Sequence, residues 1–254
     1  MPFAPLNTLI ARDIRLVATD MDGTLTEAGR FSPQLLQALI ALADMGVPVL
    51  IVTGRSAGWV QGLTSYLPVA GALAENGGLG YLWGKHSVEQ IPLTAPGKEH
   101  RPALAQMFAQ LQTEFPDLQE SSDNCFRLTD WTFDNPGFSQ DRLSALEERC
   151  RVGGWSFTYS SVQCHIKPVG QDKATGLLQV LRTYFLHLPP EAVLTVGDSP
   201  NDAPLFDPAH FPNSVGVANV AHYAGVLPHP PAYITTHSEG QGFCELVDWL
   251  GAGY

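Results

Sequence analysis

The sequence predicts an α/β fold in which a mainly parallel sheet is interrupted by a smaller α+β insert. Two observations support this fold class. Short apolar, β-branched segments alternate with helix-like segments from residue 14 to residue 78, and the same alternation resumes after residue 168. Between residues 81 and 167 the segments become mixed, with hairpin-like and helix-like stretches separated by Pro and Gly pairs. Alternating strands and helices are typical of a parallel sheet, so the middle segment reads as an insertion into it.

The first part of the chain predicts three strands with two helices between them. Residues 14–20 and the apolar run 47–53 read as strands buried on both faces. A helix is expected to begin at Ser32 and Pro33, to carry a stripe of leucines, and to stop at Gly46. A second helix is predicted over residues 56–67, and a third strand that ends in a turn over residues 70–78.

The insert and the last part are predicted in the same way. In the insert we expect a hairpin around Gly84 and Lys85, helices over 100–114 and 139–150, and strands over 125–133, 155–160 and 162–169. After Pro168 we expect a helix over 173–187, strands over 192–199, 214–219 and 232–236, and a closing helix over 240–250.

The composition limits the class of protein. The 254 residues are 44% hydrophobic and 15% charged, which is enough apolar material for a real core. A formal net charge of −11 argues against nucleic acid or an anionic membrane as the main partner. The four cysteines lack zinc or CxxC spacing, and no segment resembles a secretory signal or a membrane span. These features predict a cytoplasmic protein.

Chemistry-bearing residues follow several of the predicted strands. Asp20 and Asp22 follow the first strand, Thr53 follows the second, and Asp198 follows a late strand, while Lys173 opens the helix after the insert. Because ligands bind at the carboxyl ends of strands in open parallel sheets, we expect these residues to converge on one spot.

This convergence predicts a magnesium-dependent phosphoryl-transfer site. Asp20, Asp198 and a backbone carbonyl at Asp22 offer hard oxygen ligands that suit Mg²⁺, and the cation offsets the repulsion between the carboxylates. An Asp can attack phosphorus and form an aspartyl-phosphate. Thr53 and Lys173 can bind phosphoryl oxygens, and Asp22 can act as general acid and base.

The four segments DMDGT, IVTGR, a helix-opening Lys after an insert, and GDSPND resemble the haloacid dehalogenase-like (HAD) phosphohydrolases. The position of the insert is similar to the type IIB cap subgroup. That subgroup includes sucrose-, trehalose- and mannosyl-3-phosphoglycerate phosphatases, phosphoglycolate phosphatases and eukaryotic phosphomannomutase. The resemblance implies a Rossmann-like core of residues 1–82 and 168–254, and an α+β cap of residues 83–167 that selects the substrate.

The resemblance also implies a role for each matching residue. Asp20 would be the nucleophile and Asp22 the acid/base. The implied metal ligands are Asp20, Asp22 and Asp198, supported by Asn201 and Asp202. The implied phosphate ligands are Thr53 and Lys173, with Gly54 and Arg55 of the same segment as further candidates.

Several of these residues also have ordinary structural interpretations. The DMDGT segment alone could be a turn or a calcium loop, but Leu25 stands where an EF-hand needs Gly. Lys173 could be a solvated lysine, and Asp198 could cap a helix. Arg55 could either contact phosphate or pair with an acid. His165 and Lys167 share one face of a strand, where they either face the substrate or lie on the surface.

The sequence therefore predicts a Mg²⁺-dependent phosphatase for a small phosphorylated metabolite, with a sugar phosphate as the expected substrate class. A phosphomutase of the same fold is the alternative, and a non-catalytic metabolite-binding regulator is a third hypothesis. No nucleic-acid or membrane partner is expected. The sequence does not indicate the oligomeric state.

Overall fold

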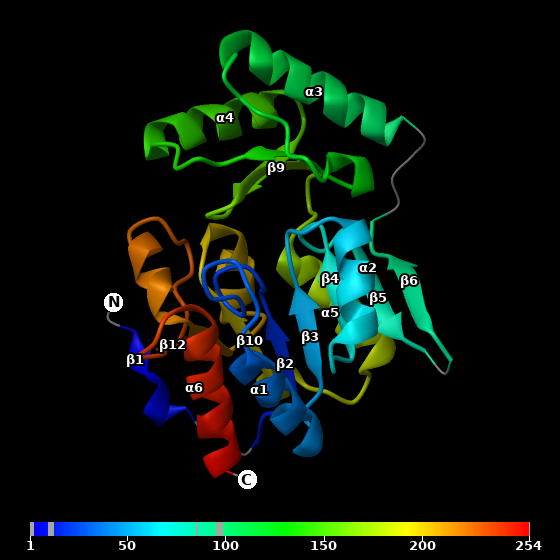
Figure 1. Cartoon of the computed structure of the whole chain (residues 1–254). Helices are drawn as coiled ribbons and strands as arrows, with labels where there is room; N and C mark the ends of the chain where they lie inside the picture. The colour runs from blue at the N-terminus through cyan, green and yellow to red at the C-terminus, as the bar shows by residue number, and fades with distance from the viewer. Residues whose placement is uncertain (1–2, 10–12, 85, 95–98, 254) are drawn as a thin grey trace.

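The larger part of the molecule is built on one nine-stranded sheet (Figure 1). The computed structural model describes residues 3–9, 13–84, 86–94 and 99–253. In spatial order the strands are β1 (Ala4–Pro5), β12 (Tyr233–Ile234), β11 (Asn213–Gly216), β10 (Val193–Gly197), β2 (Leu16–Thr19), β3 (Val49–Val52), β4 (Gly71–Ala74), β5 (Leu79–Trp83) and β6 (Val88–Pro92).

The direction of these strands confirms the predicted α/β fold. All neighbours from β1 to β4 pair in parallel, and β5 and β6 add an antiparallel hairpin at one edge. The chain runs outward from β2 to β3 and β4, and later returns to build β10, β11 and β12 on the other side of β2. The strand order therefore switches at β2 and β10, which is where open α/β sheets bind ligands.

Helices cover both faces of this sheet. Helices α1 (Pro33–Asp44), α2 (Ala57–Tyr66) and α6 (Glu239–Ala252) pack on one face, and α5 (Lys173–Tyr184) packs on the other. Short 3-10 helices complete the described chain: η1 (Leu6–Thr8), η3 (Asn124–Phe126), η4 (Pro190–Ala192), η5 (Pro200–Phe206) and η6 (Ala218–Tyr223). No helix in the described part of the chain has the length and apolar character that crossing a membrane requires.

Local sequence signals explain where α1 begins and ends. The Ser32 hydroxyl accepts a hydrogen bond from the Leu35 amide at 3.2 Å, and Pro33 occupies the first helical position. Gly46, two residues beyond the helix, has a φ of +72°, a conformation that glycine adopts at little cost. The prediction for this helix is confirmed at both ends.

A second, smaller unit contains its own sheet and core. We call residues 99–167 the smaller unit. Its strands β7 (Trp131–Asp134), β9 (Gln163–Lys167) and β8 (Ser156–Tyr159) are antiparallel in that spatial order, with α3 (His100–Glu114) and α4 (Gln140–Val152) packed on them. Figure 1 shows this unit at the end of the molecule toward which β2 and β3 point.

Two elements differ from the sequence expectation. The segment predicted as one strand over 125–133 is a strand only from Trp131, because the backbone amides of Leu128 and Thr129 bond the Glu75 carboxylate instead of a neighbouring strand. Strand β6 pairs with β5 in the large sheet, although the sequence division assigned residues from 83 onward to the insert. Lys85, where the sequence predicts a hairpin, lies outside the described residues.

Candidate active site

Two acids follow adjacent strands at the switch point of the sheet. Thr19, the last residue of β2, lies opposite Val196 of β10, and the next residue, Asp20, donates its backbone amide to the Val196 carbonyl at 2.9 Å. Asp198 follows the end of β10, and both acids are buried. One carboxylate oxygen from each of Asp20, Asp198 and Asp202 lies within 4.8 Å of the others. The parallel strands thus bring together acids that lie about 180 positions apart in the sequence.

Lys173 lies inside this cluster of acids. The Asp172 side chain accepts a hydrogen bond from the Thr175 amide at 2.7 Å and so begins α5, which places Lys173 in its first turn. The Lys173 ammonium donates to Asp20 Oδ1 at 2.5 Å and to Asp202 Oδ1 at 2.6 Å, and the side chain is completely buried. Burial alone would lower the pKa of Lys173, but the two acids raise it above its ordinary value, so it stays charged.

Asp202 and Asn219 fix the loop that carries Asp198. Asp202 Oδ2 accepts the backbone amides of Asp198 and Ser199 at 2.9 and 3.0 Å. Asn219 donates to Asp198 Oδ2 at 2.8 Å and to the Gly23 carbonyl at 3.0 Å, which connects the two acidic loops. Sequence reasoning missed Asn219, whose only signal is its position three residues after the end of β11.

The cluster fits a divalent cation with oxygen ligands. Burial raises the pKa of Asp20 to about 7, with Asp202 and Asp22 adding to the effect and Lys173 opposing it. Burial, followed by the charges of Asp20 and Asp202, raises the pKa of Asp198 well above its ordinary value. Asp202 accepts the charged Lys173 ammonium and two backbone amides. No described group donates to Asp20 Oδ2, and Asp198 accepts only from the neutral side chains of Thr24 and Asn219, so Asp20 and Asp198 are the better metal ligands. A bound Mg²⁺ would offset their repulsion.

The segment after β3 supplies Thr53, Gly54 and Arg55. Thr53 is buried, and its hydroxyl accepts the Arg55 amide at 3.1 Å. The Arg55 guanidinium donates to both oxygens of Asp22 at 2.7 and 2.8 Å and lies 4.7 Å from the centre of the Trp59 ring. Of the two interpretations of Arg55, the structure therefore shows the ion pair with an acid.

A narrow cavity joins these residues to the smaller unit. Its volume is about 10 Å³, which is room for about one water molecule. The lining residues are Asp20, Asp22, Thr53, Gly54, Arg55 and Asn201 from the larger part, and Ser160, Val162, Gln163 and His165 from the smaller unit. Residues of the smaller unit thus form one side of the cavity, opposite the residues that follow β2 and β3.

The two cap candidates of the sequence analysis have different positions. His165 lines the cavity, and its Nδ1 lies 2.9 Å from Asp130 Oδ2. Lys167 is buried, donates to the Gln171 carbonyl, and does not line the cavity. Of these two residues, the structure brings only His165 to the site.

Two buried residues that the sequence left undecided connect the smaller unit to the larger part. The Arg127 guanidinium donates to the Gly54 carbonyl, Asp130 and Asp123, each at 2.9 Å. The Glu75 carboxylate accepts the Leu128 amide at 3.0 Å and the amide and hydroxyl of Thr129 at 2.6 and 2.7 Å. The contact between the two parts therefore includes a network of buried charged and polar groups.

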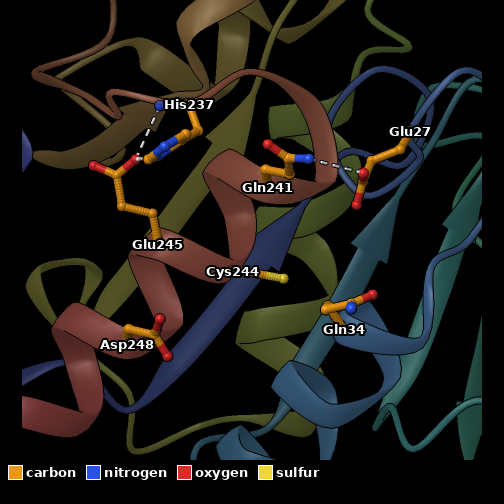
Figure 2. A pocket seen from close by; sticks show the side chains of 7 residues that line it. All are labelled: Glu27, Gln34, His237, Gln241, Cys244, Glu245 and Asp248. Atoms are coloured by element: carbon orange, nitrogen blue, oxygen red, sulfur yellow. Dashed lines mark hydrogen bonds and ion pairs between the residues drawn. The ribbon is translucent and has the colours of Figure 1, made fainter.

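A larger hollow of about 510 Å³ lies on the outer side of α6 (Figure 2). Its lining side chains are Glu27, Gln34, His237, Gln241, Cys244, Glu245 and Asp248, and none of them is a candidate of the sequence analysis. His237 pairs with Glu245 at 2.8 Å and Gln241 donates to Glu27 at 3.3 Å, so several of these groups satisfy one another. The hollow contains no buried polar group that lacks a partner, and we assign it no role.

Acid is expected to destabilise the protein through His165. Burial lowers the pKa of His165 below its usual 6.5, although Asp130 opposes this effect. The unfolded chain therefore binds a proton at this residue as the pH falls through 6.5, while the folded chain does not. The free energy of unfolding should therefore fall by up to about 1.4 kcal/mol for each pH unit below 6.5, until the pH reaches the pKa of His165 in the folded protein.

The measurement is the unfolding free energy between pH 7.5 and 5, compared with His165→Gln. Asp20 acts in the opposite direction, since its raised pKa makes the folded state gain its proton first. Because Asp20 is present in both proteins, the difference between them isolates His165. Equal pH dependence of the two proteins would contradict the expectation.

Comparisons with known proteins fit this geometry. A family model described as haloacid dehalogenase-like hydrolase matches residues 17–89. The chain is 30% identical over 247 residues to phosphoglycolate phosphatase 1 of Saccharolobus solfataricus, an alignment that covers 94% of this chain and 97% of the relative. The chain belongs to the haloacid dehalogenase-like hydrolases. A phosphoglycolate phosphatase of Methanothrix thermoacetophila is 28% identical and covers 94% of this chain and 98% of its own.

Solved structures of this superfamily have the same fold. Sucrose-phosphatase of Synechocystis sp. PCC6803, solved with sucrose and phosphate, has a TM-score of 0.65 at 17% identity and covers 94% of this chain and 98% of its own. The C-terminal domain of Candida albicans trehalose-6-phosphate phosphatase has a TM-score of 0.71 at 16% identity and covers 99% of both chains. The family predicted from the four motifs is confirmed, and the protein is a HAD phosphatase.

Proposed function

We propose that this HAD phosphatase is Mg²⁺-dependent and hydrolyses a small phosphorylated metabolite through an aspartyl-phosphate on Asp20. The observation that supports the proposal most is the meeting of Asp20, Asp198 and Lys173 at the end of β2, beside a cavity that Thr53 also lines. A nucleophile, a metal site and a phosphate-binding cation are the parts that phosphoryl transfer through an acyl phosphate needs. Asp20, Asp198 and the Asp22 carbonyl would hold Mg²⁺. When bound, Mg²⁺ would neutralise charge on the phosphoryl group.

The chain's own residues can carry the remaining steps. Lys173 holds Asp20 Oδ1, which orients the carboxylate for attack on phosphorus. Thr53 and Lys173 offer donors to the phosphoryl oxygens, and so does the Gly54 backbone. Asp22 would protonate the leaving oxygen and later take a proton from the attacking water.

The ion pair between Arg55 and Asp22 connects the proton-transfer role of Asp22 to the arrival of substrate. Both Asp22 oxygens accept from Arg55, so a substrate group that approaches Asp22 competes with this ion pair. An incoming phosphate dianion competes for the same guanidinium. We propose that Arg55 transfers from Asp22 to the substrate, so that the two interpretations of this residue describe two stages of one cycle.

We also propose that the smaller unit is the cap domain. Its own core and sheet, and the four lining residues that it contributes to the cavity, support this assignment. Because β6, Leu93 and Thr94 bond the large sheet, we place the start of the cap at residue 99 and not at residue 83, and its end at Lys167.

The names of the relatives favour a small leaving group. Relatives at 28% and 30% identity are named phosphoglycolate phosphatase, which is the name of an enzyme for a two-carbon phosphomonoester. We therefore propose short-chain phosphomonoesters, including triose and tetrose phosphates among the sugar phosphates.

Removal of the metal is expected to stop phosphate release. With Mg²⁺ the purified protein should release phosphate from members of a short-chain phosphomonoester panel; chelation should abolish this release and added Mg²⁺ should restore it. Asp198→Asn should raise the Mg²⁺ concentration that gives half-maximal activity by at least about 10-fold, because a carboxylate ligand is lost. Asp44→Asn, on the exposed end of α1, is the matched control and should behave like wild type.

The same assay separates the alternatives. Conversion of a hexose 1-phosphate into its isomer without free phosphate would indicate a phosphomutase. An absence of turnover with every phosphomonoester, with and without Mg²⁺, would favour the non-catalytic regulator and contradict the proposal.

A further inference from the structure

The segment that lines the cavity after β3 is held through its backbone carbonyls. We call residues 53–55 the phosphate segment. The Thr53 carbonyl accepts the backbone amide of Asn76 at 3.0 Å. The Arg55 carbonyl accepts the backbone amide of Glu75 at the same distance. Both donors belong to the turn after β4, so this turn sets the position of the two ends of the phosphate segment.

The turn that makes these two bonds has an uncommon backbone. Glu75 has a φ of +53° and Asn76 has a φ of +52°. Asparagine adopts this left-handed conformation at modest cost, but glutamate does so rarely. A residue held in such a conformation is often found at a functional position. The backbone bond to Arg55 does not require a glutamate, because almost any residue has the same amide, so the side chain needs a reason of its own.

The Glu75 carboxylate joins the phosphate segment to the smaller unit. The residue is completely buried, and its Oε1 accepts the amide of Ala57, the first residue of α2, at 3.0 Å. The smaller unit supplies the other donors, which are the Leu128 amide and the amide and hydroxyl of Thr129. Glu75 therefore contacts the phosphate segment, the helix that follows it and the smaller unit at once.

The donors from the smaller unit stabilise the charged form of Glu75. Burial raises the pKa of Glu75 above its ordinary value and the charge of Asp130 adds to this effect, while the Thr129 donors and the charge of Arg127 oppose it. Without residues 128–129 in place, the carboxylate would keep only the Ala57 amide among these donors. Docking of the smaller unit and the position of the Glu75 side chain therefore depend on each other.

We propose that Glu75 is a positioning residue that couples the docking of the smaller unit to the geometry of the phosphate segment. When Leu128 and Thr129 hold the carboxylate, Glu75 fixes the Arg55 carbonyl through its amide and the start of α2 through its Oε1. Phosphate then binds tightly only while the smaller unit is docked. The inference rests on the proposed phosphatase function and deepens it, since it adds a control of phosphate affinity by residues that do not line the cavity.

A second connection between the same parts limits the expected effect. Arg127 of the smaller unit donates to the Gly54 carbonyl at 2.9 Å, between the two carbonyls that the turn holds. This bond does not involve Glu75, and neither do the bonds of Lys173. A change at Glu75 should therefore weaken phosphate binding in part and should not abolish it.

The test measures phosphate affinity in variants that break the connection at either end. The probe is inorganic phosphate, used with Mg²⁺ as a competitive inhibitor of p-nitrophenyl phosphate hydrolysis. Glu75→Gln places an amide donor where the carboxylate now only accepts. It should raise the Ki of phosphate and the KM about 10- to 30-fold and change kcat by less than about 3-fold, because ground state and transition state lose the same contacts.

Thr129→Val is the milder change and breaks the connection from the smaller unit. Valine keeps the volume of the side chain but removes the hydroxyl that donates to Glu75. It should raise the Ki of phosphate about 3- to 10-fold. The Ki does not depend on the folded fraction of a sample, so a loss of stability alone would leave it unchanged.

The double variant identifies the route. If Glu75 transmits the contact of Thr129, the Ki of the double variant should lie within about 2-fold of the Ki of Glu75→Gln. Glu89→Gln and Thr113→Val, at exposed positions of β6 and α3, are the matched controls and should behave like wild type.

Two results would overturn the positioning role while p-nitrophenyl phosphate turnover upheld the phosphatase. One is a wild-type Ki in Thr129→Val, and the other is a double variant in which the two effects multiply. If the wild-type protein hydrolyses no phosphomonoester at all, the proposed function itself fails and the positioning role fails with it.

Discussion

Asp20→Asn is expected to lower phosphate release by at least about 10⁴-fold, the largest effect on activity that we predict. Asparagine keeps the shape of the side chain and an oxygen that can accept from Lys173, but its amide cannot attack phosphorus to form an acyl phosphate. The substitution also removes a negative charge from a buried group that Asp198 and Asp202 repel. The protein should therefore stay folded, so the loss of turnover can be read as a loss of chemistry.

Two measurements check this result. Steady-state phosphate release is compared among wild type, Asp20→Asn and the control Asp44→Asn. Rapid acid quench of wild type with substrate, followed by peptide mass analysis, should place a phosphoryl group on the peptide that contains Asp20, and the group should be absent from the Asp20→Asn protein. Turnover of Asp20→Asn above about one hundredth of the wild-type rate would show that Asp20 is not the nucleophile.

The main sheet and the core of the site could be predicted because local patterns and one topological rule determine them. Buried apolar strands are recognisable without partners, and a parallel sheet places their carboxyl ends at one edge. Asp20, Asp198 and Lys173 therefore had to meet if the alternation of strands and helices was interpreted correctly, and the structure places them in one cluster.

The contact between the two parts could not be predicted because it depends on long-range partners. Glu75 lies in the turn after β4, and its carboxylate accepts from Thr129, 54 positions away. Arg127 lies in a segment that was predicted as a strand, and that pattern does not indicate what its side chain contacts. Neither composition nor periodicity says which acids a buried arginine will meet. The partner of Arg55 was open for the same reason.

Arg127→Met is expected to lower the free energy of unfolding by about 3–5 kcal/mol, the largest effect on stability that we predict. The arginine side chain is 0% exposed and is paired with Asp123 and Asp130. Methionine fills a similar volume but leaves two buried carboxylates without a cation, and it also removes the bond to the Gly54 carbonyl. We expect the cap to separate more readily from the larger part, with a higher KM for substrates bound in the closed state.

Chemical denaturation of wild type and Arg127→Met measures the effect, and two further proteins identify its cause. Arg149→Met, which removes an exposed pair with Glu114, should change stability little, because solvent screens that pair. Adding Asp123→Asn and Asp130→Asn to Arg127→Met should restore part of the lost stability, since the cost comes from unpaired charges and not from lost packing. If the triple variant were as unstable as Arg127→Met, the buried carboxylates would not be the source of the loss, and the arginine would act mainly by holding the Gly54 carbonyl.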